Sequence, residues 1–309
     1  MGLLFFIFLR IFMKFNHFFG LCAITSGIIL AGCDARNNAA ETKPEAKAQT
    51  NEAADAKTDA KAEGKPAGEE KIKVGVMSGP EHKVAEVAAK VAKEKYGLVV
   101  EYVEFNDYAL PNTAVSKGDL DANAMQHKPY LDKDSQEKKL DNLVIVGNTF
   151  VYPLAGYSKK IKNVNELKEG ATIAVPNDPS NLARALILLE KQGLIKLKDN
   201  TNLFSTSMDI VENPKKLNIK EVDTSVAARA LDDVDLAVVN NTYAGQVGLT
   251  AKDGVFVEEK DSPYVNIIVA RADNKDSKAV QDFVKAYQSD EVVAEAKKQF
   301  QEDGVVQGW

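Results

Sequence analysis

The chain has 309 residues, of which 45% are hydrophobic, and a formal net charge of -6 at neutral pH. This negative balance argues against a nucleic-acid partner, because binding to the phosphate backbone relies on clustered Lys and Arg. Both cysteines, Cys22 and Cys33, lie near the N-terminus. The remainder offers neither an internal disulfide nor a thiolate metal site, so a hydrophobic core must stabilise it.

The N-terminal segment has the features of an export signal that ends in a lipid-attachment site. Lys14 precedes an apolar stretch at residues 18–30, and two small residues and then Cys33 follow. This pattern is typical of a signal peptide, and the stretch is too short to span a bilayer. It resembles the bacterial lipoprotein signal, in which the cysteine thiol is lipidated. We expect residues 1–32 to be the signal peptide and Cys33 the membrane anchor; a secretory signal with a chance cysteine is the alternative.

Residues 33–71 are expected to be the lipidated cysteine and a disordered tether. Residues 34–70 contain no Val, Ile, Leu or aromatic side chain, so they cannot bury enough apolar surface to offset the entropy of ordering. A flexible chain of this length spans roughly 30–35 Å, which would hold a folded body above a membrane. An Ala-rich helix is the alternative, but Pro44, Gly64 and Pro66 disfavour one rigid rod.

From residue 72 onward, predicted strands alternate with predicted helices. Residues 82–96, for example, carry apolar side chains at helical spacing. The predicted strands are 72–77, 98–105, 122–125, 143–146, 172–175, 219–222, 236–239 and 265–270, and the predicted helices are 82–96, 112–117, 180–192, 226–231 and 277–300. This alternation indicates an α/β architecture with parallel-type sheets. The length of the segment from residue 72 to residue 309 is typical of a protein with two lobes.

The turn after the strand at 172–175 is a candidate anion site. Asp178 is a good N-cap, and Pro179 suits the first helical position. Arg184 follows near the positive end of the same predicted helix. A helix N-terminus with an arginine close by is a suitable place for a carboxylate. The alternative is an ordinary surface arginine on a capped helix.

Polar side chains also gather at the ends of other predicted strands. His127 follows the strand at 122–125, and Asn240 and Asn266 lie at or beside two further strands, although Asn is disfavoured there. A catalytic base at His127 lacks a Ser or Cys nucleophile motif, so a hydrogen-bonding histidine is the simpler interpretation. No metal-ligand spacing, phosphate loop or dinucleotide fingerprint is present, so neither metal nor cofactor is expected.

Several long sequence segments within residues 72–309 are distinctive enough to be recognised. They are Phe105-Asn106-Asp107-Tyr108-Ala109-Leu110-Pro111-Asn112, residues 118–124 with Gln126-His127-Lys128-Pro129-Tyr130-Leu131, residues 147–153, Val175-Pro176-Asn177-Asp178-Pro179 and Ser262-Pro263-Tyr264-Val265-Asn266. Over residues 72–309 the chain resembles the methionine-binding lipoproteins, the substrate-binding subunits of bacterial methionine ABC importers. Strings of this length are far more specific than any single spacing motif.

The resemblance implies a two-lobed α/β fold of the periplasmic-binding-protein type II, with the ligand cleft between the lobes. Lobe one would comprise residues 72–150 plus 241–309, and lobe two residues 151–240. The two crossings between the lobes would lie near residues 149–152 and 239–241.

The resemblance also implies a set of ligand-binding residues: Phe105, Tyr108, Met125, His127, Asn181, Arg184, Asn240 and Asn266. By this resemblance, Arg184 and Asn181 of this chain would hold the ligand carboxylate. Asn240 and Asn266 would accept hydrogen bonds from its ammonium. Phe105 and Tyr108 would contact the thioether, and His127 would close the pocket. Met125 departs from the family, which usually has an aromatic residue there, so selectivity could be looser.

We therefore expect a membrane-tethered binding protein that captures methionine, the L form at least, and delivers it to an ABC permease driven by a separate cytoplasmic ATPase. It would catalyse no reaction, and its body would face the periplasm or the outside of the cell membrane. A binding protein for a related zwitterion, such as a methionine-containing dipeptide, is the first alternative. An enzyme on a similar bilobed fold and a surface lipoprotein with host contacts are further alternatives.

Overall fold

The computed structural model describes residues 70–302 and 304–309. The predicted signal peptide, Cys33 and the predicted tether up to residue 69 lie outside the described residues. None of the helices in the described part has the length and hydrophobicity that a membrane span requires. Strand β1 begins at Glu70, earlier than predicted, because its parallel pairing with β2 extends to Glu70 and Lys71.

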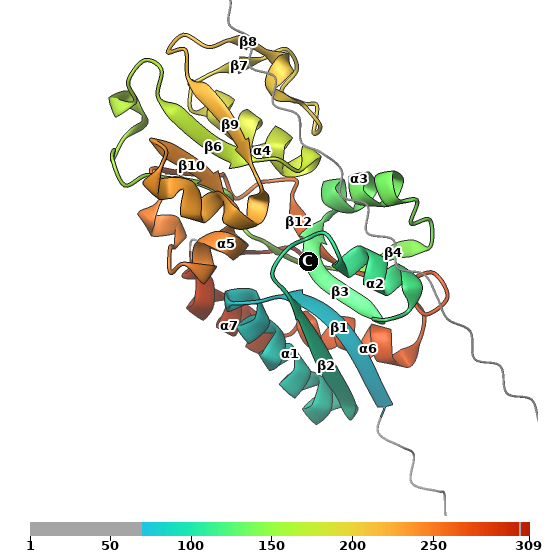
Figure 1. Cartoon of the computed structure of the whole chain (residues 1–309). Helices are drawn as coiled ribbons and strands as arrows, with labels where there is room; N and C mark the ends of the chain where they lie inside the picture. The colour runs from blue at the N-terminus through green and yellow to red at the C-terminus, as the bar shows by residue number, and fades with distance from the viewer. Residues whose placement is uncertain (1–69, 303) are drawn as a thin grey trace, which may run out of the picture. The chain divides into compact units, whose positions relative to one another are not determined.

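The first of two large sheets has six strands in the order β13-β4-β12-β3-β1-β2 (Figure 1). The strands are β1 (Glu70–Met77), β2 (Leu98–Phe105), β3 (Ala122–His127), β4 (Leu143–Val151), β12 (Val265–Arg271) and β13 (Val306–Gln307). β1 pairs in parallel with β2 and β3, as predicted, but β12 runs antiparallel to β3 and β4. The sheet is therefore mixed.

Five helices accompany this sheet: α1 (Pro80–Tyr96), α2 (Pro111–Lys117), α3 (Lys128–Lys138), α6 (Lys278–Tyr287) and α7 (Asp290–Phe300). α1 begins with Pro80 at a first-turn position and ends at Gly97, whose φ of 67° suits a residue without a Cβ. Its apolar face packs with α6 and α7 over the sheet, in a core that includes Val84 and Phe283. α3 was not predicted from the sequence, because its charged segment has too few apolar residues to show helical spacing.

The second sheet has five strands in the order β11-β5-β10-β6-β9. They are β5 (Ala155–Tyr157), β6 (Thr172–Pro176), β9 (Asn218–Val222), β10 (Leu236–Val239) and β11 (Phe256–Val257). α4 (Pro179–Lys191) packs its apolar face on this sheet, with Leu186 and Leu189 against Ile173 and Leu236. The smaller elements are η1 (Val164–Glu166), β7 (Lys196–Leu197), η2 (Ser207–Asp209), β8 (Ile210–Glu212), η3 (Thr224–Asp232), α5 (Asn241–Gln246) and η4 (Ala251–Asp253).

The chain passes between the two sheets at two places. The first lies between β4 and β5, at residues 152–154, next to the predicted crossing. The second lies between β11 and β12, at residues 258–264. The prediction of a second crossing near residues 239–241 is wrong, because β11 pairs with β5 in the five-stranded sheet. This strand falls within the range predicted for lobe one, and its two residues are too few for a recognisable strand pattern.

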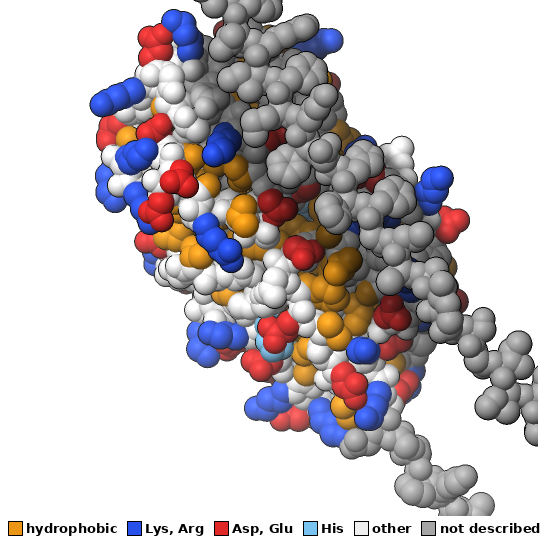
Figure 2. Space-filling view, viewed as in Figure 1, with side chains coloured by type: hydrophobic (Ala, Val, Ile, Leu, Met, Phe, Trp, Pro, Cys, Tyr) orange, Lys and Arg blue, Asp and Glu red, His pale blue; other side chains and the backbone are white. Residues whose placement is uncertain are grey.

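A third hydrophobic cluster joins the two sheets. Met77 and Met125, from the six-stranded sheet, pack with Tyr157, Ala237 and Tyr243. All of the described residues belong to one unit, Glu63–Trp309. Where its surface is visible in Figure 2, side chains of both charge signs are intermingled. The carboxyl ends of β3 and β10 meet at the junction of the sheets, which positions the site.

A candidate ligand-binding site between the two sheets

A cavity with about 330 Å³ of empty space lies at this junction. It is lined by most of the residues predicted to bind ligand, namely Tyr108, Met125, His127, Asn181, Arg184, Asn240 and Asn266. Phe105, the remaining predicted residue, does not line the cavity; it packs half-buried against the hydrophobic cluster that joins the sheets. The cavity also has lining residues outside the predicted set: Gln126, Tyr130, Tyr152, Asn241 and Thr242.

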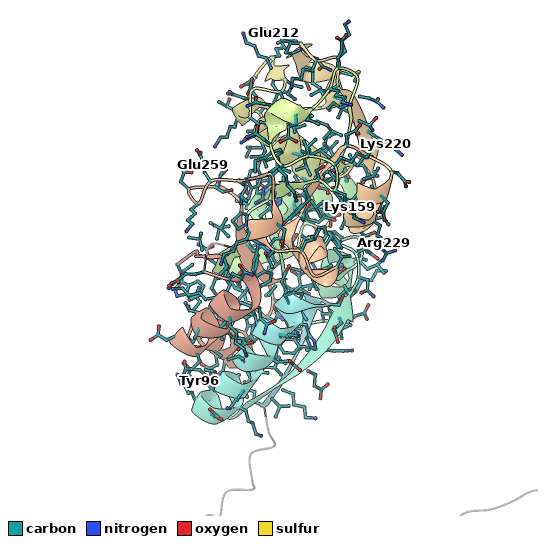
Figure 3. All side chains as sticks on the ribbon, turned by 90° about the vertical axis from the view of Figure 1, so that its left-hand side faces the viewer. Tyr96, Lys159, Glu212, Lys220, Arg229 and Glu259 are labelled. Carbon is teal, nitrogen blue, oxygen red and sulfur yellow. The ribbon has the colours of Figure 1, made fainter. Side chains whose placement is uncertain are left out.

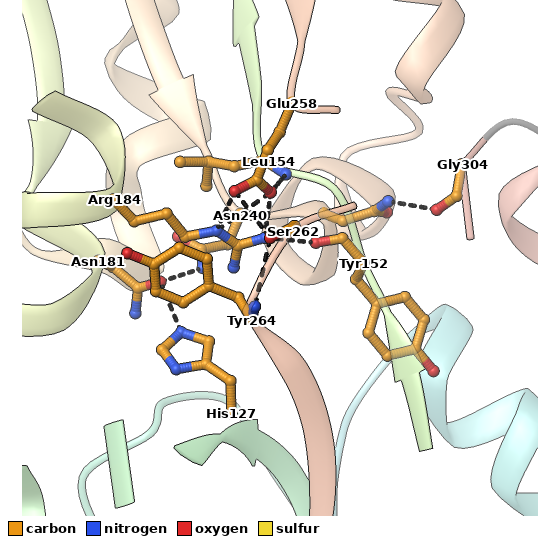
Figure 4. A network of polar contacts seen from close by, with 11 residues as sticks. His127, Tyr152, Leu154, Asn181, Arg184, Asn240, Glu258, Ser262, Tyr264 and Gly304 are labelled. Atoms are coloured by element: carbon orange, nitrogen blue, oxygen red, sulfur yellow. Dashed lines mark hydrogen bonds and ion pairs between the residues drawn. The ribbon is translucent and has the colours of Figure 1, made fainter. Parts of the chain in front are cut away.

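Arg184 lies in the second turn of α4 and is only 4% exposed. Its Nε donates to Glu258 Oε1 at 3.0 Å, and one terminal nitrogen, Nη2, donates to Glu258 and to the carbonyl oxygen of Tyr152 at 3.0 Å (Figure 4). The guanidinium also lies 4.5 Å from the centre of the Tyr264 ring. Arg184 therefore ties both crossings to α4.

Glu258 was not predicted as a site residue. Its carboxylate also accepts from the backbone N–H of Leu154 and from the hydroxyl of Ser262, both at 3.1 Å. Its neighbour Glu259 points to the surface, where it pairs with Lys191 (Figure 3). Two adjacent glutamates in a charged loop give no sequence signal that one of them is turned inward.

The hydrogen bonds of Arg184 leave one nitrogen for a ligand. Its contacts with the described residues use Nε and Nη2, whereas Nη1 has none. Because the guanidinium is planar, Nη1 lies outside the Nε–Nη2 edge that these contacts occupy, and its N–H groups can donate to a carboxylate. Glu258 and the Tyr152 carbonyl thus occupy the Nε–Nη2 edge, and Nη1 is the nitrogen that could hold the ligand carboxylate expected at Arg184.

His127 is neutral and has a fixed tautomer. Its Nδ1 accepts from the backbone N–H of Tyr130 at 3.2 Å, as the N-cap of α3. Nε2 therefore carries the hydrogen and donates to Asn181 Oδ1, 3.2 Å away. Burial lowers the pKa of His127 to about 3, and the charge of Arg184 acts in the same direction. This neutral imidazole bridges the end of β3 to α4.

The three asparagines of the site differ in what they offer a ligand. The amide of Asn181 is already used, because it donates to Asp178 at 3.0 Å and accepts from His127 and from Asn240 at 2.8 Å. Asn240 Oδ1 is buried with no partner among the described residues. Asn266 lies opposite His127 in the β12–β3 register. Asn240 is therefore the clearest free acceptor in the cavity.

Aromatic rings form another wall. The Tyr108 hydroxyl donates to Thr242 Oγ1 at 3.1 Å, and the Tyr130 hydroxyl donates to the Tyr108 carbonyl at 3.0 Å. The two rings meet edge to face, with centroids 5.7 Å apart. Met125, only 2% exposed, lines the same cavity. Together with Met125, these rings give the cavity an apolar surface suited to a thioether or an alkyl chain.

The cavity thus combines one charged donor, one free amide acceptor and an apolar wall. In the described part of the chain, no cluster of three or more His, Cys, Asp or Glu residues could hold a metal ion. The fold and the site together define a two-lobed substrate-binding protein for a small polar molecule. The family model described as NlpA lipoprotein matches residues 72–309, and the chain belongs to this family.

Similar proteins carry related names. The chain is 71% identical to a probable D-methionine-binding lipoprotein MetQ of Haemophilus influenzae, over 96% of this chain and 100% of the relative. It is also 71% identical to outer membrane lipoprotein 1 of Mannheimia haemolytica, with the same coverage of 96% and 100%.

Solved structures agree with this assignment. A crystal structure of the methionine-binding protein MetQ is 62% identical with a TM-score of 0.75, covering 77% of this chain and 98% of that one. A nutrient-binding protein from Burkholderia cenocepacia, solved bound to methionine, is 49% identical with a TM-score of 0.75, covering 77% of this chain and 100% of that one.

Proposed function

We propose that this protein binds methionine and delivers it to an ABC importer. The observation that carries the proposal is the cavity itself, which is lined by Arg184, by Asn240 with its unpartnered Oδ1, and by the apolar side chains of Tyr108 and Met125. A zwitterion with an apolar side chain is the complementary ligand. The names of the relatives, and the methionine in a similar solved structure, support methionine as that ligand.

In this proposal each side chain recognises one part of the ligand. Arg184 binds the carboxylate, while Asn240 and Asn266 accept from the ammonium. Tyr108 and Met125 contact the thioether, with Phe105 supporting the wall from behind. His127 and Asn181 act by bridging the two sheets around the ligand.

The protein would act without covalent chemistry. Closure of the lobes would bury the ligand, and a permease with its cytoplasmic ATPase would receive it. A lipid on Cys33 would hold the body at the membrane, facing the periplasm or the outside of the cell. The single guanidinium, the amide groups and the short apolar wall of the cavity match the groups of one amino acid, which favours a single amino acid over a dipeptide.

Calorimetric titration of the ligand-stripped protein tests the proposal. L-methionine, D-methionine and glycyl-methionine would be titrated separately. We expect L-methionine to bind and glycyl-methionine to bind much more weakly. Tighter binding of the dipeptide would identify the alternative ligand class, and no binding of any of the three would overturn the proposed function.

A further inference from the structure

A buried carboxyl group lies behind the wall of the cavity. Glu81 is in the first turn of α1 and is only 2% exposed. The one hydrogen bond to its carboxylate among the described residues comes from the Thr242 hydroxyl. No Lys, Arg or His in the described part of the chain forms an ion pair with it. A carboxyl buried without a cation is costly, so its presence calls for an explanation.

The groups that face Glu81 are neutral. They are tyrosines from the segment after β2, the first crossing, α5 and α6: Tyr108, Tyr152, Tyr243 and Tyr287. Charged residues on the neighbouring elements pair with one another instead, in the pairs His82–Glu104, Lys71–Glu101, Lys95–Glu291, Lys298–Glu295, Lys278–Asp282 and Lys285–Asp282. Among the described residues, no cationic side chain is thus paired with Glu81.

Two hydroxyl groups connect Glu81 to the cavity. Thr242 Oγ1 donates to the Glu81 carboxylate and accepts from the Tyr108 hydroxyl at 3.1 Å. Both Thr242 and Tyr108 line the cavity. While Glu81 is ionised, both hydroxyl hydrogens point toward it, which leaves the lone pairs of the Tyr108 oxygen to accept from a ligand. A protonated Glu81 can donate to Thr242 and reverse this polarity.

The other carboxylate near Tyr108 is already engaged. Asp178 accepts from Asn181 at the start of α4 and from the Thr224 hydroxyl at 2.7 Å. Arg184 and Glu258 form an ion pair, so together they add no net charge. Asp178 keeps its charge, but its oxygens already accept these hydrogen bonds, whereas the Glu81 carboxylate accepts one among the described residues. Among the described carboxylates near Tyr108, Glu81 therefore has the greater capacity to act on a cationic group in the cavity.

We propose that Glu81 is the counter-charge of the ligand's ammonium group, which it recognises through the hydroxyls of Thr242 and Tyr108. Glu81 is a positioning residue in this proposal, since it acts through other side chains. The inference rests on the proposed function, because it assigns the ammonium of the proposed ligand to the hydrogen-bonded series Tyr108–Thr242–Glu81.

Proton release should then accompany binding. Burial raises the pKa of Glu81 to about 7, and the hydrogen bond from Thr242 offsets this only in part. A ligand ammonium favours the ionised form, so binding near neutral pH should displace a fraction of one proton. Below this pH the affinity for methionine should fall by up to about tenfold per pH unit.

Calorimetry at pH 7 in two buffers of different ionisation enthalpy measures the protons released. The wild-type protein should release protons on binding methionine, and Glu81→Gln should release none and bind about tenfold more weakly. Glu81→Gln should bind 4-(methylsulfanyl)butanoate, which lacks the ammonium, as well as the wild type does. Glu86→Gln is the matched control, because Glu86 is an exposed residue of the same helix, and it should behave as the wild type.

If Glu81→Gln releases as many protons as the wild type and shows the same pH profile of affinity, the inference is overturned and the proposed function stands. Absence of methionine binding at every pH would overturn the proposed function as well. Infrared difference spectra of the wild-type protein need no variant. The band of a protonated carboxyl should weaken when methionine is added, and Thr242→Val should abolish that change. An unchanged carboxyl band in the wild type would contradict the inference.

Discussion

At the scale of single residues, Arg184 has two tasks that the structure separates. Its Nε and Nη2 hold Glu258 and the crossing segments, and the residue also lines the cavity, with Nη1 unbonded among the described residues. A role in ligand binding alone would let this side chain be lost with the fold intact. The buried ion pair excludes that outcome, because removing one partner leaves the other charge unpaired.

We expect Arg184→Ala to weaken methionine binding by about 2–5 kcal/mol. The same change should destabilise the fold by about 3–5 kcal/mol, since Glu258 is left buried without its cation. Adding Glu258→Ala should restore much of the stability without restoring binding. Urea unfolding and calorimetric titration of the wild type and the two variants measure the two effects. Unchanged methionine affinity in Arg184→Ala would remove Arg184 from the binding site.

Met125 bears on how well the cavity discriminates methionine from ligands of similar shape. Met125→Phe places an aromatic residue in the cavity wall, as the family resemblance implies is usual there, and a rigid ring would present a fixed face to the thioether. We expect discrimination of methionine over norleucine to increase by roughly 0.5–1.5 kcal/mol. Titrations of the wild type and Met125→Phe with each ligand decide the matter. An equal loss of affinity for both ligands would mean that the larger ring overpacks this buried position and that Met125 only fills space.

At the scale of secondary-structure elements, Glu81 in the first turn of α1 makes the free energy of unfolding depend on pH. The pKa of Glu81 rises from its ordinary 4.5 to about 7 on folding. The folded state therefore holds the proton more tightly than the unfolded state. The contribution of Glu81 to the free energy of unfolding is fully present below pH 4.5 and is lost as the pH rises through about 7.

Glu81→Gln should remove this pH dependence. One pKa unit corresponds to about 1.4 kcal/mol, so relative to the wild type the variant should gain about 3 kcal/mol between pH 4 and pH 8. Urea unfolding of both proteins across this range is the measurement. Glu86→Gln, on the exposed side of α1, should follow the wild-type curve. Parallel curves for the wild type and Glu81→Gln would contradict a raised pKa at Glu81.

At the scale of the whole molecule, the expected membrane attachment depends on a residue outside the described part of the chain. Cys33→Ser removes the sulfur atom that would carry the lipid. We expect the variant to lose fatty-acid incorporation and to accumulate as an unprocessed or soluble form. Metabolic labelling with a fatty acid, followed by membrane fractionation, is the test. Equal labelling of the variant and the parent would contradict lipidation at this cysteine.

The sequence by itself determined the features that depend on neighbours along the chain. The apolar spacing of α1, the Asp178 cap of α4 and the strands that end near His127 and Asn240 are all local patterns, and they are confirmed. Long family strings added the two-lobed fold and a candidate site, most of which the structure gathers around one cavity. The ligand roles of those residues stay predictions.

Only the tertiary structure decided which distant residues meet. Arg184 and Glu258 are 74 positions apart, and Thr242 is 161 positions from Glu81. No local pattern records such pairs, because burial and hydrogen bonding depend on how the two sheets pack. The same reason explains the later second crossing and the position of Phe105 outside the cavity. Folding brings these distant groups together, and their charges then decide what the cavity can bind.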